Sequence, residues 1–98
     1  MLPLDTVTRE DFAACLNQDF ELITGTGGIT LQLVEAQARG PGHADRRAPF
    51  SLTFQGTPAL RLPQAIYRLQ NPTLGPMEIF LVQIGADAQG SYFEAAFN

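Results

Sequence analysis

The chain has 98 residues, of which ten are acidic and six are basic, giving a formal net charge of −4. This length predicts a single domain over residues 1–98, with no room for a second core. One cysteine and one histidine exclude an internal disulfide and a zinc site with four Cys or His ligands. Apolar residues make up 45% of the chain and charged residues 16%, which predicts a domain folded by packing alone.

The charge and hydropathy patterns argue against nucleic-acid and membrane partners. The sequence pI is about 4.6, and the basic residues, all of them arginines, form no long run, whereas nucleic-acid binding requires many neutralised phosphates. The longest apolar run is Ile79–Val82, far short of the roughly 20 residues that span a bilayer. No signal-peptide pattern is present either, so we expect a cytoplasmic protein.

The first element in chain order is a short helix, expected over residues 8–17. Thr8 is a suitable N-cap, and Asp11 three residues later gives a weaker form of the capping box. Three apolar residues follow the spacing of one helical face, namely Phe12, Cys15 and Leu16. A helix this short is not stable alone in water, so we expect its apolar face to dock on the rest of the domain.

After Asp19 the apolar residues alternate with period two, which is typical of β-strands. Strands are expected over residues 20–22, 29–33, 50–55, 65–70, 78–84 and 91–97. Segments rich in glycine, proline and asparagine separate them. The strand 78–84 is apolar on both faces, so we expect it to be central or to be covered on its second side by the helix.

These elements together predict an all-β fold. The connections are too short for helical crossovers, so the sheet should be antiparallel. We expect a small antiparallel β-barrel or sandwich, formed over residues 20–98 by a meander of about six short strands, with the N-terminal helix plugging or capping it. Closure is favoured because Phe50–Phe54 and Ile79–Val82 carry no charge and would promote aggregation on an open edge.

The longest predicted loop, residues 37–47, contains the strongest candidates for a binding site. Arg39, His43, Arg46 and Arg47 lie there, and arginine side chains bind carboxylates or phosphates bidentately. This interpretation makes the chain a barrel that binds a small ligand or an anion of unknown identity. The alternative is a solvated loop whose arginines pair with Asp45 and with carboxylates on neighbouring strands.

Catalytic patterns are weak by comparison. Cys15, His43 and Asp45 would suit a small thiol hydrolase, but Cys15 falls on the apolar face of the predicted helix, where cysteine behaves as a buried hydrophobe. Glu78 and Glu94 are strand carboxylates, which are usually solvated. We therefore expect no enzyme activity, no cofactor and no metal site.

Four residues are candidates for a protein interface: Arg61, Tyr67, Arg68 and Tyr92. Arginine and tyrosine are enriched in interface hot spots. The alternative is that the arginines pair with Glu78 or Glu94 across strands and that the tyrosines lie at the core edge with their hydroxyls in water. The expected partners are another protein or further copies of this chain.

Several segments resemble an uncharacterised bacterial family of small single-domain proteins, the DUF6916 group. They include Pro49–Leu52, Leu62–Gln64 and Glu94–Asn98, within a resemblance that runs from about Phe20 to the C-terminus. Ala65 and Gln83 stand where the family pattern has Gly and Pro. The resemblance implies no activity, cofactor or catalytic residue, and it suggests an accessory or structural component of a larger, phage-tail-like assembly. We therefore expect a non-enzymatic β-rich module that acts through protein–protein contacts.

Overall fold

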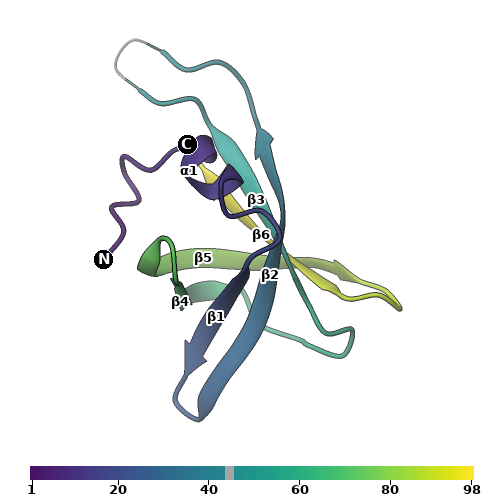
Figure 1. Ribbon diagram of the computed structural model, residues 1–98. Coiled ribbons are helices and arrows are strands. Elements are labelled where there is room, and N and C mark those ends of the chain that lie inside the picture. The colour runs from purple at the N-terminus through teal and green to yellow at the C-terminus, as the bar shows by residue number, and fades with distance from the viewer. Residues whose placement is uncertain (44–45) are drawn as a thin grey trace.

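The computed structural model describes residues 1–43 and 46–98 (Figure 1). A short helix precedes six strands, as the sequence predicts. The elements are α1 (Arg9–Ala13), β1 (Asp19–Thr24), β2 (Gly27–Ala38), β3 (Phe50–Gly56), β4 (Ala65–Asn71), β5 (Gly75–Ala86) and β6 (Ser91–Phe97). Among the described residues, no helix has the length and apolarity needed to cross a bilayer.

The six strands form a closed antiparallel barrel in the order β1-β2-β3-β6-β5-β4. Strand β1 completes the closure by pairing with β4, where Leu22 lies opposite Leu69. Strand β3 pairs with β2 on one side and β6 on the other. The uncharged segment Phe50–Phe54 therefore has no open edge, which confirms the argument for closure.

The strand order differs from that of a simple meander, because the connection from β3 to β4 does not join neighbouring strands. These strands are consecutive in the chain, yet β3 pairs with β6 and β4 pairs with β1. The barrel thus consists of two three-stranded meanders, β1–β3 and β4–β6. The middle strand of each, β2 or β5, has 12 residues and contains a register shift, at Leu33/Glu35 or at Gln83/Gly85. Such bulges bend a strand, which allows each middle strand to pair with a different neighbour along each half.

Apolar side chains fill the barrel interior, and α1 closes one end of it. The largest fully buried side chains come from the helix and all six strands: Phe12, Phe20, Leu22, Leu31, Leu33, Phe50, Leu52, Phe54, Leu69, Met77, Ile79 and Phe93. The Phe12 ring centroid lies 6.5 Å from that of Phe20, 6.0 Å from that of Phe50 and 5.7 Å from that of Phe97. The helix therefore plugs the barrel, as predicted.

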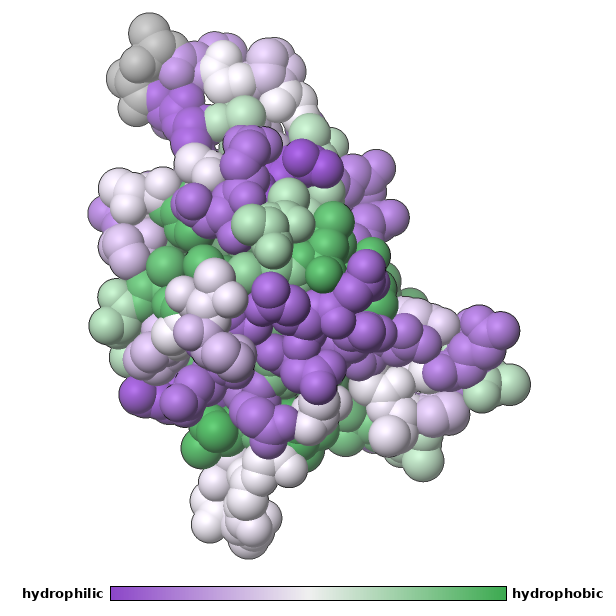
Figure 2. All heavy atoms as spheres, in the orientation of Figure 1, coloured by the Kyte–Doolittle hydropathy of each residue, from purple (hydrophilic) through white to green (hydrophobic). Residues whose placement is uncertain are grey.

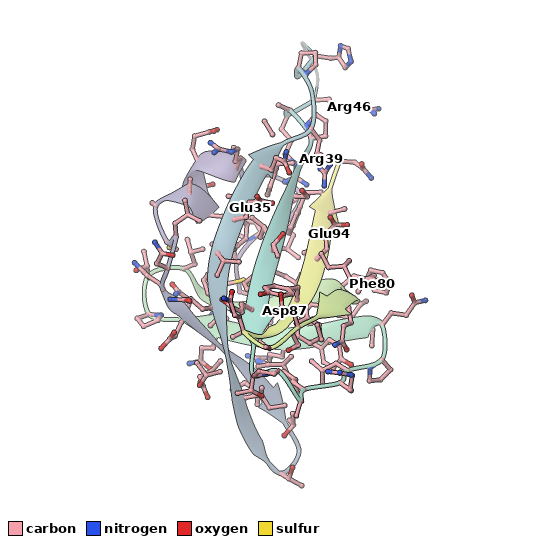
Figure 3. The ribbon with its side chains drawn as sticks, turned by 90° about the vertical axis from the view of Figure 1, so that its right-hand side faces the viewer. Glu35, Arg39, Arg46, Phe80, Asp87 and Glu94 are labelled. Atoms are coloured by element: carbon pink, nitrogen blue, oxygen red, sulfur yellow. The ribbon has the colours of Figure 1, made fainter. Side chains whose placement is uncertain are left out.

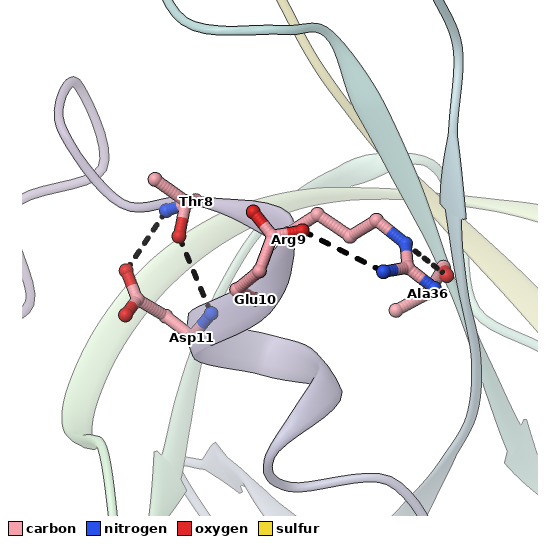
Figure 4. A network of polar contacts seen from close by, with 5 residues as sticks. All are labelled: Thr8, Arg9, Glu10, Asp11 and Ala36. Carbon is pink, nitrogen blue, oxygen red and sulfur yellow. Dashed lines mark hydrogen bonds and ion pairs between the residues drawn. The ribbon is translucent and has the colours of Figure 1, made fainter.

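The helix begins where the sequence predicts but ends early. Asp11 N donates to Thr8 Oγ1 at 3.3 Å, and Thr8 N donates to Asp11 Oδ2 at 2.9 Å, which confirms the capping box (Figure 4). The helix ends at Ala13, and the chain then turns to Asn17, whose φ of 69° ends any helical path. Leu16 is consequently 38% exposed, so its predicted place on the docked face was wrong.

Candidate functional site

The predicted binding loop is a hairpin that extends beyond the barrel (Figure 1). Strand β2 continues to Ala38, so the first two residues of the predicted loop belong to the strand. His43 N donates to Arg46 O at 3.0 Å, and Arg46 N donates to His43 O at 3.1 Å. Both side chains are exposed. The predicted partner Asp45 lies outside the described residues.

Arg39 is engaged by the barrel surface. Its Nε donates to Ser51 Oγ at 2.8 Å, and its Nη2 lies 3.2 Å from Glu94 Oε2 (Figure 3). This is the pairing with a carboxylate on a neighbouring strand that the sequence left open as the alternative. The same ion pair engages Glu94, one of the two strand carboxylates considered for acid–base chemistry.

Arg47 joins the N-terminal segment to the end of β6. Its Nη1 donates to Leu4 O at 2.6 Å and to Val7 O at 2.5 Å, and its Nε donates to Asn98 O at 3.1 Å. Its guanidinium also lies over two core phenylalanine rings. These contacts use most of the donors with which Arg47 would hold an anion.

The structure does not gather the four predicted binding residues into one site. His43 and Arg46 line a shallow hollow of about 290 Å³ with Pro41, Pro49 and Asn98, whereas Arg39 and Arg47 stabilise the fold. Anion binding by this hairpin stays a prediction.

Cys15 lacks the environment of a reactive thiol. It is fully buried, its Sγ lies 3.9 Å from Asn71 Oδ1, and burial raises the pKa of the thiol. Nucleophilic cysteines need exposure and a lowered pKa. His43 is exposed on the hairpin that extends beyond the barrel, whereas Cys15 is buried in the core. Cys15 therefore lacks the exposure and the lowered pKa that the hydrolase hypothesis requires of its nucleophile. In the described part of the chain, no three His, Cys, Asp or Glu side chains cluster as metal ligands.

Two of the predicted interface residues serve local structure. Arg61 Nη1 donates to Pro58 O and Leu60 O, each at 2.8 Å, and thereby orders the β3–β4 connection. The Tyr67 side chain packs against the core, and its hydroxyl donates to Pro63 O at 2.5 Å. Tyr67 therefore lies at the core edge, as one alternative from the sequence proposed, but its hydroxyl bonds to a backbone carbonyl, where that alternative placed it in water.

The other two predicted interface residues lie on different strands. The Tyr92 hydroxyl contacts the Asp87 carboxylate at 3.2 Å, and burial together with this carboxylate raises the pKa of Tyr92. Arg68 is exposed on β4, directly opposite Glu78 of β5, one of the two partners considered for it. The ion pairs among the described residues join Arg9 to Glu10 and Arg39 to Glu94, so Arg68 and Glu78 are in neither.

An exposed apolar patch on the outer face of β4, β5 and β6 was missed from the sequence. Ile66 and Phe80 lie opposite each other across β4 and β5, and they are 69% and 52% exposed. Both line a hollow of about 470 Å³ together with Ala96 of β6. We call these three residues the β4–β6 patch. Figure 3 shows Phe80 on the outside of the barrel, below Glu94 and apart from Arg46.

The structure confirms one of the two alternatives expected for β5, because this strand lies between β4 and β6. Among the described residues, no helix covers its outer face, which was the other alternative. Phe80 and, beyond it, Ile84 with 55% exposure are therefore left in contact with solvent. Figure 2 shows, in the orientation of Figure 1, that apolar residues reach the surface among hydrophilic ones. Adjacent exposed apolar side chains mark interaction sites more often than single ones.

The fold and the patch define a small closed β-barrel domain with a filled interior and an apolar patch on its outer surface. A family model, DUF6916, described as a domain of unknown function, matches residues 7–97. The chain therefore belongs to the DUF6916 family, and the match includes the helix as well as the segments that carry the resemblance, except for the final residue, Asn98. Comparisons with curated proteins and with solved structures find no match.

Proposed function

We propose that this domain is a non-enzymatic module that acts through protein–protein contacts, with the β4–β6 patch as its contact surface. The observation that carries the proposal is the exposure of Ile66 and Phe80, side by side on the outside of a closed barrel. Such a module would serve as an accessory or structural component of a larger assembly, of which phage-tail-like assemblies are one example.

The energetic argument concerns apolar area left in water. Fully burying one large apolar side chain contributes about 1.5–3 kcal/mol. Covering the exposed parts of Ile66 and Phe80 would therefore contribute about 2–4 kcal/mol to association. This contribution is available to a partner because the domain's own core is complete without these two side chains.

Other parts of the molecule offer less support for the competing functions. Large buried side chains fill the interior that a ligand-carrying barrel would need. Arg39 and Arg47, half of the proposed anion site, are engaged by Glu94 and by backbone carbonyls. Cys15 is buried with a raised pKa. Of the functions considered, a protein–protein contact is the one that would use the exposed side chains of Ile66 and Phe80.

The test compares three forms of the chain: the wild type, Phe80→Asp, and the control Ile84→Asp. Ile84 is about as exposed as Phe80 and lies on the same strand, within the register shift between Gln83 and Gly85. Each form is immobilised and exposed to a lysate of the organism that encodes it, and light scattering follows self-association. We expect the wild type and Ile84→Asp to make the same contacts and Phe80→Asp to lose them. A strictly monomeric wild type that retains no protein would contradict the proposal.

A further inference from the structure

The β4–β6 patch lies next to two opposite charges, Arg68 and Glu78, that form no ion pair among the described residues. In the register of β4 and β5, Ile66 faces Phe80 and Arg68 faces Glu78. Residues two apart on a strand point to the same side, so the apolar pair and the charged pair form neighbouring rows of one outer face. All four side chains are exposed. This face therefore carries an apolar row and, beside it, one positive and one negative charge on adjacent strands.

This arrangement is self-complementary. Consider a two-fold axis in the plane of contact, parallel to β4 and β5 and running between them. The rotation places the β4 positions of one copy over the β5 positions of the other. Arg68 then meets the partner's Glu78, and Ile66 meets the partner's Phe80. Each contact occurs twice, as in every interface between identical surfaces related by a two-fold axis.

Resting on the proposed function, we propose that the occupant of the β4–β6 patch is a second copy of this chain, related by that axis. The charges favour this position of the two-fold axis over nearby positions. An axis running along β5 would place Glu78 against the partner's Glu78, and like charges in contact across an interface are strongly disfavoured. The axis between β4 and β5 instead gives two opposite-charge contacts, and neither residue makes an ion pair within the described part of its own chain.

The hollow that the patch lines supplies space for the partner's apolar side chain. It has a volume of about 470 Å³, and its lining includes Leu4 and Asp5 of the N-terminal segment, Phe80 and Ala96 on the barrel side, and the charged side chains of Arg47 and Glu78. The partner's Ile66, placed over Phe80, is the side chain that faces this hollow. An apolar side chain seated in a partner's pocket is the usual centre of a protein interface, with charged residues around it.

The experiment uses charge reversal in the full chain. Sedimentation equilibrium of the wild type from about 1 μM to 1 mM should show a monomer–dimer equilibrium. Arg68→Glu alone and Glu78→Arg alone should each weaken dimerisation at least about tenfold, since each creates two like-charge contacts. An equimolar mixture of the two variants should dimerise as the wild type does, because every charged contact in the mixed pair joins opposite charges.

Two controls separate this geometry from general charge effects. Arg46→Glu makes the same charge change on the exposed hairpin and should leave the dimer intact. Glu78→Arg lowers the net negative charge, so it would strengthen association if net charge governed it, whereas the proposed contact predicts weakening. Circular dichroism confirms that each variant is folded.

Each result either supports or overturns the proposed dimer. A dimer that both single variants weaken and their mixture restores supports the inference. A dimer that neither variant weakens, or that the mixture does not restore, overturns it, since the copies then meet elsewhere. A wild type that stays monomeric throughout also overturns it. In that last case, loss of a different partner by Phe80→Asp would leave the proposed function standing.

Discussion

The guanidinium carbon of Arg47 lies 5.6 Å from the centroid of the Phe97 ring. It lies equally far from the centroid of Phe50, whose ring stacks on that of Phe97 with centroids 4.6 Å apart. The same guanidinium donates to backbone carbonyls of Leu4, Val7 and Asn98. A single side chain thus fastens the N-terminal segment to the aromatic end of the core.

Replacing Arg47 by alanine should lower the free energy of unfolding by about 2–3 kcal/mol, because it removes charge-assisted hydrogen bonds and a cation–π contact. Arg47→Lys should recover only part of this, since an ammonium cannot reproduce the planar fork of donors. Urea unfolding measures both. The control is Arg46→Ala, an exposed neighbour whose effect should stay within about 0.5 kcal/mol. Equal effects at positions 46 and 47 would contradict the role assigned to Arg47.

Asn71 is a buried polar side chain whose bonds hold the turn between β4 and β5. Its Oδ1 accepts from Thr73 N at 2.8 Å and from Leu74 N at 3.0 Å, and its Nδ2 donates to Gln18 Oε1 at 3.2 Å. Asn71→Ala should cost about 2 kcal/mol of unfolding free energy, because partners are left unsatisfied. Thermal unfolding measures this cost, and Gln70→Ala, at the exposed neighbouring position, is the control. A cost no larger than that of Gln70→Ala would show that water replaces these bonds.

Much of the fold was predictable because its determinants are local in sequence. Thr8 and Asp11 are three residues apart, so their reciprocal bonds can be recognised without knowing the rest of the structure. The alternation of Phe50, Leu52 and Phe54 likewise predicts which face of β3 is buried. The pairing of β3 with β6 has no comparable local signature, because turn residues show where a strand ends but not which strand lies beside it.

The candidate site was less predictable because its residues act over long separations. Arg39 meets Glu94, which is 55 residues away, and Arg47 meets Leu4, which is 43 residues away. The sequence shows that these arginines share one loop, but it does not show that two of them bond to other parts of the fold. The exposure of the outer face of β5 was not predicted for a related reason. An apolar side chain such as Phe80 gives the same sequence pattern whether its own chain or another molecule covers it.

The buried thiol of Cys15 should make stability depend on pH at the alkaline end. Burial raises the pKa of Cys15 above its ordinary value of 9.0. The unfolded chain therefore loses this proton first, so the contribution is fully present below about pH 9 and is lost as pH rises through the folded pKa. Unfolding free energies of the wild type should fall as the pH rises above about 9, by at most about 1.4 kcal/mol per pH unit. Cys15→Ala should be less stable at neutral pH but flatter over this range. Parallel pH profiles for the two forms would contradict this account.

Ile79 and Phe80 are adjacent in β5 but should differ sharply in what they contribute. Ile79 is 2% exposed and points into the core, whereas Phe80 is 52% exposed and points outward. Ile79→Ala should therefore cost about 2–4 kcal/mol of unfolding free energy, and Phe80→Ala, measured on the dilute monomer, should cost less than about 1 kcal/mol. If Phe80→Ala proved as destabilising as Ile79→Ala, the aromatic ring would belong to the domain's own packing and would not be available to a partner. A small cost combined with lost association would instead show that the chain holds a large apolar ring in water for the sake of a contact with another molecule.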